Sequence, residues 1–265
     1  MLDVILLCGQ SNQAGRGGVK DVRPQAACAQ RCVPDASAPQ RAWDGVVPPE
    51  CAVNSAVLCL QPNGEAWEQA QEPLHRDVDA PGKPCGIGPG LAFAAALLRE
   101  QPGCRLGLVP CAVGGSALRE WELPDGALGR RAVARAHAAL RAAAGDARLR
   151  CLLFYQGETD ATEATDAATW GASFVRWVAA MREELQAPQL PVGVVAITAA
   201  DSACPHLDAV RAAQLRIPAA VSHSFVVDAR GLALQADGLH LTTEAQVQLG
   251  TMLARALMDF EQASA

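Results

Sequence analysis

Short apolar runs that alternate with helical patterns constrain the fold of this chain more than any other feature. Each run has the length of a strand and is rich in apolar residues, as expected of parallel strands that are buried on both faces. The five runs are Val4–Cys8, Arg105–Pro110, Arg150–Tyr155, Pro191–Thr198 and Ser224–Asp228. Because neighbouring parallel strands are joined by crossover helices, this alternation predicts a doubly wound α/β structure.

Helices are predicted between and after these strands, over Gly90–Glu100, Ala127–Ala144, Ala167–Leu185 and Thr243–Phe260. Gly145 follows the second helix and Pro188 follows the third, and both residue types end helices. The fourth helix opens with Thr243-Glu244-Ala245-Gln246, which is a capping-box pattern.

The segment from Ala14 to Pro89 is the irregular part of the chain. It is rich in Pro, Gly and Cys and shows little periodicity, apart from a short apolar run at Val57–Leu60. A loop of this length is usually functional, so we interpret it as an irregular insertion that walls a site beside the first strand. The whole chain of 265 residues is near the upper limit for one hydrophobic core, so a single domain over residues 1–265 is expected.

Composition excludes several classes of partner. Half of the residues are hydrophobic, which suffices for a core, and the net charge is −6 with no basic run, so we expect no nucleic-acid partner. The apolar stretches are far shorter than the roughly 20 residues of a membrane span, so no membrane partner is expected. The chain begins almost inside its first strand without a secretory signal, and we expect a trimmed N-terminus. Compartment and oligomeric state stay open.

The chain contains ten cysteines, which we expect to be free thiols. Three lie in apolar runs and are expected to be buried: Cys8, Cys111 and Cys151. Five lie in the insertion and would be able to pair in an oxidising compartment: Cys28, Cys32, Cys51, Cys59 and Cys85. The chain has no Cys-x-x-Cys motif, and no histidine stands near Cys28 and Cys32, so neither a metal site nor a cofactor is expected.

A serine, a histidine and an aspartate are the parts of an activated nucleophile. Ser11 follows the first strand in Gly9-Gln10-Ser11-Asn12, at the sheet edge where open α/β folds bind ligands. Asp237 precedes His240 by three residues, and at that spacing it can accept the Nδ1 proton and leave Nε2 free for Ser11. Each residue also has a plain structural interpretation: Ser11 suits a helix N-cap, and Asp237-Gly238 suits a turn.

Two further loops follow strands at the same edge. Gly114-Gly115 allows close backbone approach and can supply an N–H to an oxyanion, although a tight turn would also explain it. Gln156 can donate a side-chain N–H, and Glu158 is a second carboxylate, although a polar loop before a helix would also explain both.

Taken together, these blocks resemble the SGNH hydrolases. The closest resemblance is to the plant-type members of the carbohydrate-esterase branch that is related to sialate O-acetylesterases and acetylxylan esterases. The matching blocks are Gly9-Gln10-Ser11-Asn12, Gly114-Gly115-Ser116, Gln156-Gly157-Glu158, Asp237-x-x-His240, Trp43-Asp44-Gly45, Glu72-Pro73-Leu74-His75 and Gly86-Ile87-Gly88-Pro89-Gly90. They run along almost the entire chain.

The resemblance implies a three-layer α/β/α fold around a five-stranded parallel sheet. It implies that Ser11 is the nucleophile, His240 the base and Asp237 the third member of the triad. Some members of the branch use the glutamate of the Gln-Gly-Glu block instead, which makes Glu158 the alternative third member.

The resemblance also implies an oxyanion hole formed by the Ser11 N–H, the Gly115 N–H and the Gln156 side chain. Asn12 and Glu158 are expected to support the site.

The expected function is therefore that of a metal-independent serine esterase. It would remove O-acetyl groups from an acetylated carbohydrate, either a small molecule or a polysaccharide, through an acetyl-enzyme. Alternatives are an SGNH lipase-like or thioesterase-like acyl hydrolase, or a non-catalytic carbohydrate-binding descendant of the fold. A nucleotide-binding role is disfavoured because the turn after the first strand lacks the Gly-x-Gly-x-x-Gly fingerprint.

Overall fold

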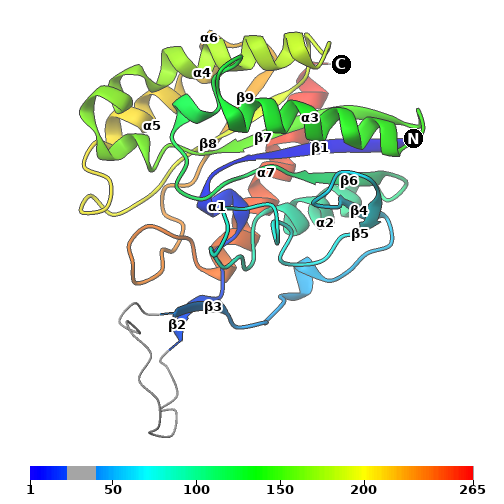
Figure 1. The fold of residues 1–265 in the computed structure, drawn as a ribbon, viewed down its shortest axis with the longest axis horizontal. Coiled ribbons are helices and arrows are strands. Elements are labelled where there is room, and N and C mark those ends of the chain that lie inside the picture. The colour runs from blue at the N-terminus through cyan, green and yellow to red at the C-terminus, as the bar shows by residue number, and fades with distance from the viewer. Residues whose placement is uncertain (23–39, 265) are drawn as a thin grey trace, which may run out of the picture.

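A central β-sheet lies between two layers of helices in the computed structural model, which describes residues 1–22 and 40–264 (Figure 1). The strands are β1 (Leu2–Gly9), β2 (Val19–Val22), β3 (Gln40–Trp43), β4 (Val57–Leu60), β5 (Trp67–Gln69), β6 (Arg105–Pro110), β7 (Ala147–Tyr155), β8 (Val192–Ala196) and β9 (Ser224–Asp228). The α-helices are α1 (Ser11–Ala14), α2 (Gly90–Glu100), α3 (Ala127–Ala142), α4 (Ala164–Glu184), α5 (Leu207–Leu215), α6 (Ile217–Ala220) and α7 (Thr243–Ala263). Single-turn 3₁₀ helices lie at Pro49–Cys51, Leu118–Glu120 and Asp160–Thr162.

The main sheet confirms the predicted parallel core and extends it. Within the described residues it has seven strands in the order β5-β4-β6-β1-β7-β8-β9. The five predicted strands are β6, β1, β7, β8 and β9, and each neighbouring pair among them is parallel. The expected count of five is corrected because the short run Val57–Leu60 pairs with β6 in parallel as β4, and β5 then pairs with β4 in an antiparallel hairpin.

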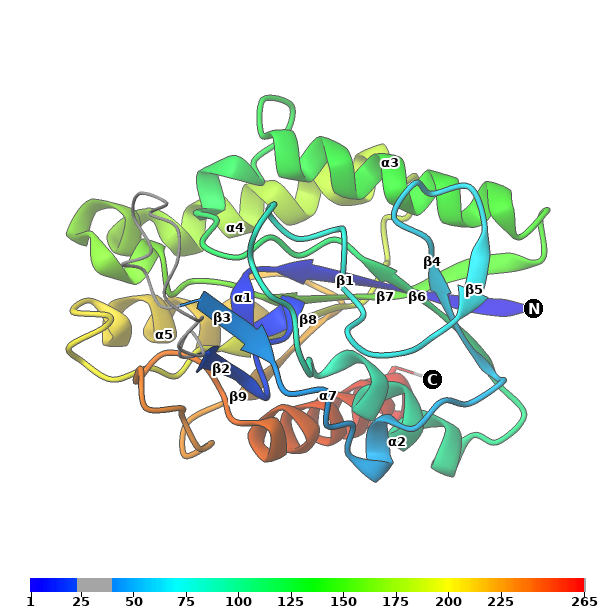
Figure 2. The ribbon, with the colours of Figure 1, turned by 60° about the horizontal axis from the view of Figure 1, so that its bottom comes forward.

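The helices cover both faces of the sheet. In Figure 1 and Figure 2, α3 and α4 lie on one face, and α2 and α7 lie together on the other. The four predicted helices are α2, α3, α4 and α7, with ends that differ by up to three residues. The short helices α5 and α6 were not predicted. Within the described part of the chain, no helix has both the length and the apolar character that a membrane span requires.

The start of α7 corrects the capping-box prediction. Thr242, one residue before the predicted position, is the N-cap, and its hydroxyl accepts the Ala245 N–H at 3.2 Å. The Gln246 side chain does not return to the cap but donates to the carbonyl of Asn12 at 3.0 Å. The first turn of α7 is thereby tied to the turn after β1.

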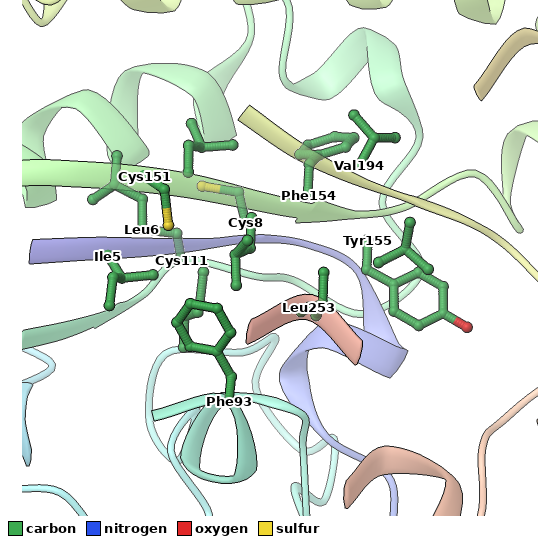
Figure 3. Packing of buried hydrophobic residues seen from close by; sticks show 14 of the residues in the cluster. Ile5, Leu6, Cys8, Phe93, Cys111, Cys151, Phe154, Tyr155, Val194 and Leu253 are labelled. Atoms are coloured by element: carbon green, nitrogen blue, oxygen red, sulfur yellow. The ribbon is translucent and has the colours of Figure 1, made fainter. Parts of the chain in front are cut away.

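The apolar core surrounds β1, the strand that leads to the predicted nucleophile. The side chains of Val4–Cys8 are fully buried. Figure 3 shows Phe93 of α2 and Leu253 of α7 on one side of β1, with Phe154 of β7 on the other side. Burial of each such side chain stabilises the fold by about 1.5–3 kcal/mol, so β1 is held rigidly between the two helical layers.

The strand order places a crevice next to the end of β1. The chain passes from β1 to β6 on one side and then crosses to β7 on the other, so the topological switch point lies between β1 and β7. Ligands of open α/β sheets bind outside the carboxyl ends of the strands at such a point. Ser11 directly follows β1, and Gln156 directly follows β7.

Gly9 permits the close approach of these two strand ends. Its φ is +130°, and a Cβ atom at this position would lie 2.1 Å from the carbonyl oxygen of Tyr155. The next residue, Gln10, donates its N–H to the same oxygen at 2.9 Å. Only glycine fits here, because any side chain would push β1 and β7 apart.

We therefore expect Gly9→Ala to destabilise the protein strongly. Backbone strain and overpacking together predict a loss of about 2–6 kcal/mol in the free energy of unfolding, measured by denaturant titration. Gly103→Ala is the control, because a Cβ at Gly103 meets no atom within 4 Å. Equal stabilities of the two variants would contradict the packing constraint at Gly9.

Candidate active site

A cavity of about 400 Å³ opens at the switch point between β1 and β7. Its lining includes Ser11, His240, Gly115, Glu158 and Lys83. Four of the predicted site residues thus reach one cavity, although they lie as far as 229 positions apart in the sequence.

Ser11, His240 and Asp237 form a continuous chain of hydrogen bonds. The His240 Nε2 atom lies 2.9 Å from the Ser11 Oγ, and its Nδ1 lies 2.7 Å from the Asp237 Oδ2. Because Asp237 accepts the Nδ1 proton, Nε2 of the neutral ring is the nitrogen free to take a proton from the serine hydroxyl. This is the geometry of an activated serine.

The Asp237 carboxylate also builds the turn that carries His240. Its Oδ1 accepts the N–H groups of Leu239 and His240, each at 3.0 Å. Gly238 has φ +66°, which the turn between them requires. The turn interpretation and the catalytic interpretation of Asp237 therefore describe the same arrangement, in which one oxygen fixes the backbone and the other contacts the ring.

The surroundings shift the pKa values of both partners toward the active protonation states. Burial favours the neutral form of Asp237, but the hydrogen bonds from His240 and Leu239 outweigh it and lower the pKa to about 2. In His240, by contrast, burial lowers the pKa. The Asp237 carboxylate opposes this shift, while the positive charges of Arg16 and Arg41 reinforce it. At neutral pH the site therefore contains a carboxylate and a neutral imidazole, which is the form of a general base.

The fully buried Asn12 side chain holds the loop on both sides of His240. Its Oδ1 accepts the Leu241 N–H at 3.0 Å, and its Nδ2 donates to the Leu239 carbonyl at 3.2 Å. The same Nδ2 donates to the Glu158 Oε1 at 2.8 Å. Asn12 thus connects the turn after β1, the loop after β7 and the histidine loop.

Glu158 contacts Asn12 rather than His240. In the described residues, Asp237 is the carboxylate that is hydrogen-bonded to the His240 ring. Burial raises the pKa of Glu158 to about 7. Its second oxygen, Oε2, is buried without a hydrogen-bond partner among the described residues. The geometry therefore favours Asp237 over Glu158 as the group that orients the ring.

Two backbone N–H groups are free to face an oxyanion. Ser11 is the first residue of α1, where helix N–H groups have no intrahelical partner. Gly115 follows β6 with φ +76° and lines the cavity. Among the described residues, neither the Ser11 N–H nor the Gly115 N–H donates a hydrogen bond.

The Gln156 side chain lies elsewhere than expected. It is fully buried, and its Nε2 donates to the Ser116 carbonyl at 3.1 Å and to the Asp160 carboxylate. Its Oε1 accepts the Trp170 Nε1–H at 3.0 Å, which fixes the orientation of the amide. Both amide hydrogens are therefore engaged within the protein, and the expected donation to an oxyanion stays a prediction.

The charged residues of the insertion that surround this site were not predicted from the sequence. Arg16 binds Asp79 at 2.5 Å, and Lys83 donates to the Gly114 carbonyl at 2.6 Å. Arg41 of β3 lies 3.4 Å from the Asp237 Oδ2. All four belong to a segment without periodicity, so only their charge distinguishes them in the sequence.

The structure also bears on the metal and cysteine predictions. Within residues 1–22 and 40–264, no group of three or more His, Cys, Asp or Glu side chains is arranged to hold a metal ion. The described cysteines are free thiols, and Cys8, Cys111 and Cys151 are buried. Cys28 and Cys32 lie outside the described residues.

Comparison with known proteins gives a consistent assignment. A family model described as carbohydrate esterase, sialic acid-specific acetylesterase, matches residues 1–259. A probable carbohydrate esterase of Arabidopsis thaliana is 43% identical over 258 residues, which cover 96% of this chain and 90% of that protein.

Solved structures show the same fold. An X-ray structure of a protein from Arabidopsis thaliana has a TM-score of 0.84 at 41% identity, covering 97% of this chain and 98% of that one. The structure of NanS has a TM-score of 0.71 at 16% identity, covering 99% and 98%. A carbohydrate acetylesterase from Xanthomonas citri has a TM-score of 0.63 at 20% identity, covering 98% of this chain and 57% of that one. At the two lower identities the likeness concerns the fold alone.

We expect the His240 ring to titrate below the ordinary histidine value of about 6.5, as measured by NMR. Asp237→Asn should lower this pKa further, because the carboxylate stabilises the imidazolium. Arg41→Gln should raise it, because a nearby positive charge is removed. Shifts of the same sign in the two variants would contradict this electrostatic description.

Proposed function

The chain belongs to the carbohydrate esterase family of sialic acid-specific acetylesterases and is a carboxylic ester hydrolase, and we propose that it removes O-acetyl groups from an acetylated carbohydrate by a Ser-His-Asp mechanism. The main support for this mechanism is the series of hydrogen bonds from Ser11 through His240 to Asp237.

In the first half of the reaction, His240 takes the proton of the Ser11 hydroxyl as its oxygen attacks the acetyl carbonyl. Asp237 stabilises the imidazolium that forms. His240 then gives this proton to the alcohol oxygen of the sugar, the ester bond breaks, and the acetyl group stays on Ser11 as an ester.

In the second half, water attacks the acetyl-enzyme with His240 again as base. The Ser11 oxygen leaves, regains its proton from His240, and acetate is released. Protonation of His240 in acid removes the base in both halves, so activity falls with decreasing pH as its lowered pKa is reached.

The tetrahedral intermediates would be stabilised by the backbone N–H groups of Ser11 and Gly115. Their lack of other partners among the described residues supports this role, since preorganised donors need no rearrangement when charge develops. Gln156 contributes indirectly, because its amide fixes the Ser116 carbonyl in the same loop as Gly115.

The substrate class rests on the family and on the shape of the site. The cavity is open, and its volume of about 400 Å³ suits a small acyl group with part of a sugar. The matching family model, described as a sialic acid-specific acetylesterase, and the Arabidopsis relative, described as a probable carbohydrate esterase, support an acetylated sugar rather than a long acyl chain.

The direct test is hydrolysis of p-nitrophenyl acetate by the parent protein and by the Ser11→Ala and His240→Ala variants. Loss of the nucleophile or of its base should lower kcat by about 10⁴-fold or more. Ser55→Ala, a change at an exposed serine, is the matched control and should retain the parent rate. Circular dichroism verifies that each variant is folded.

A folded Ser11→Ala variant with the parent rate would exclude the mechanism. The same assay with butyrate and octanoate esters separates the alternative acyl hydrolases, since a lipase-like enzyme would prefer the longer chains. Acetylated xylan and acetylated sialic acid then test the carbohydrate specificity.

A second comparison separates the two carboxylates. Asp237→Asn should lower kcat by about 10⁴-fold, because it disturbs the tautomer of His240. Glu158→Gln retains an oxygen that can accept from Asn12, so its effect should stay below about 10-fold, the value of one ordinary hydrogen bond. If Glu158→Gln were as damaging as Asp237→Asn, Glu158 would be the third member of the triad.

A further inference from the structure

The two backbone groups of Gly114, its N–H and its C=O, contact opposite charges from the insertion. The Lys83 Nζ donates to the Gly114 carbonyl oxygen at 2.6 Å. The preceding Gly114 N–H donates to the Asp79 Oδ1 at 2.6 Å, and the other oxygen of Asp79 binds Arg16. Both peptide groups of Gly114 are therefore held by charge-assisted hydrogen bonds, which are stronger than neutral ones.

The carbonyl that Lys83 binds belongs to the same peptide unit as the Gly115 N–H. A trans peptide is planar, with its C=O and N–H pointing in opposite directions, so a fixed carbonyl fixes the direction of the N–H. The ammonium group also polarises the unit and increases the positive charge on the amide hydrogen. A Cβ at Gly115 would lie 3.0 Å from the Lys83 Nζ, so the ammonium group lies close to this residue.

Lys83 differs from Arg16 and Arg41, the two arginines that line the cavity, because it forms no ion pair among the described residues. In the described residues, Arg16 is paired with Asp79, and Arg41 is paired with Asp21 and Asp237. Lys83 forms no ion pair there, and its one hydrogen bond is to Gly114. Its charge is therefore not paired with a carboxylate of residues 1–22 or 40–264.

We propose that Lys83 is a positioning residue of the oxyanion hole, which orients and polarises the Gly114–Gly115 peptide so that the Gly115 N–H stabilises the tetrahedral intermediate. The proposal rests on the proposed esterase function. Its effect is specific to the transition state, because the charge on the acetyl oxygen grows only as the tetrahedral intermediate forms. It should therefore appear in kcat rather than in KM.

The test compares Lys83→Met, which keeps the length of the side chain without its charge, with Lys83→Arg, which keeps the charge. We expect Lys83→Met to lower kcat for p-nitrophenyl acetate about 5- to 20-fold, less than the 10²–10³ for complete loss of an oxyanion donor. KM should change less than about twofold, because ground-state binding is unaffected. Lys83→Arg should recover most of the rate.

Lys20→Met is the matched control, because Lys20 is the other lysine of the chain and pairs with Asp44. A boronic acid that forms a tetrahedral adduct with Ser11 supplies a second readout. Its affinity should fall by the same factor as kcat in Lys83→Met, while inhibition by acetate stays unchanged. A merely structural role would not separate these two ligands.

An unchanged kcat in Lys83→Met, or a raised KM at constant kcat, would overturn the proposal; the latter would make Lys83 a substrate-binding residue. These results are distinguishable from failure of the proposed function. In that case the parent protein would not hydrolyse the ester, or Ser11→Ala would hydrolyse it at the parent rate.

Discussion

The hydrogen bonds of the Asn12 side chain are the interaction on which the geometry of the site depends. Ser11 and His240 arrive from opposite ends of the chain, and neither the sheet nor the helices alone align them. Asn12 follows the nucleophile directly and binds the backbone on both sides of the histidine. Because these groups are buried, their loss would leave unpaired polar atoms and would cost about 1–3 kcal/mol for each group. The distance between nucleophile and base is thus set by a group that does not react.

The irregular insertion contributes charge to the site as well as a wall. Asp79, Lys83 and Arg41 come from loops and from a small hairpin, yet each reaches a group that takes part in the proposed reaction. Arg41 adjoins the carboxylate of the triad, and the other two hold the loop that carries Gly115. A preorganised polar environment of this kind is usually the largest contribution to enzymatic rate enhancement. The insertion therefore contributes charged groups to the site and does not merely cover the edge of the sheet.

The elements that the sequence predicted well are those whose cause is local. The five parallel strands have continuous apolar runs because both of their faces are buried, and Ser11 and His240 stand in short motifs at strand or helix ends. The features that the sequence did not predict have non-local causes. Thr243 is the better cap in the sequence because Gln246 follows it at the capping-box spacing, but in the fold the Gln246 side chain donates to Asn12. The amide of Gln156 is directed by Asp160 and Ser116 rather than by its own motif. Lys83 acquires its position only when the insertion folds over Gly114.

The position of β1 has a consequence for how the protein is made. This strand is synthesised before the other described strands of the sheet, yet it lies in the middle, between β6 and β7, which follow about 100 and 140 residues later. The histidine emerges 229 residues after the serine, so at 5–20 residues per second the two are separated by roughly 10–45 s of synthesis. The nascent chain must therefore carry this strand, which is apolar apart from Asp3, without a neighbouring strand until β6 has been synthesised. The contact between Ser11 and His240 can form only after the segment that carries the histidine has been synthesised.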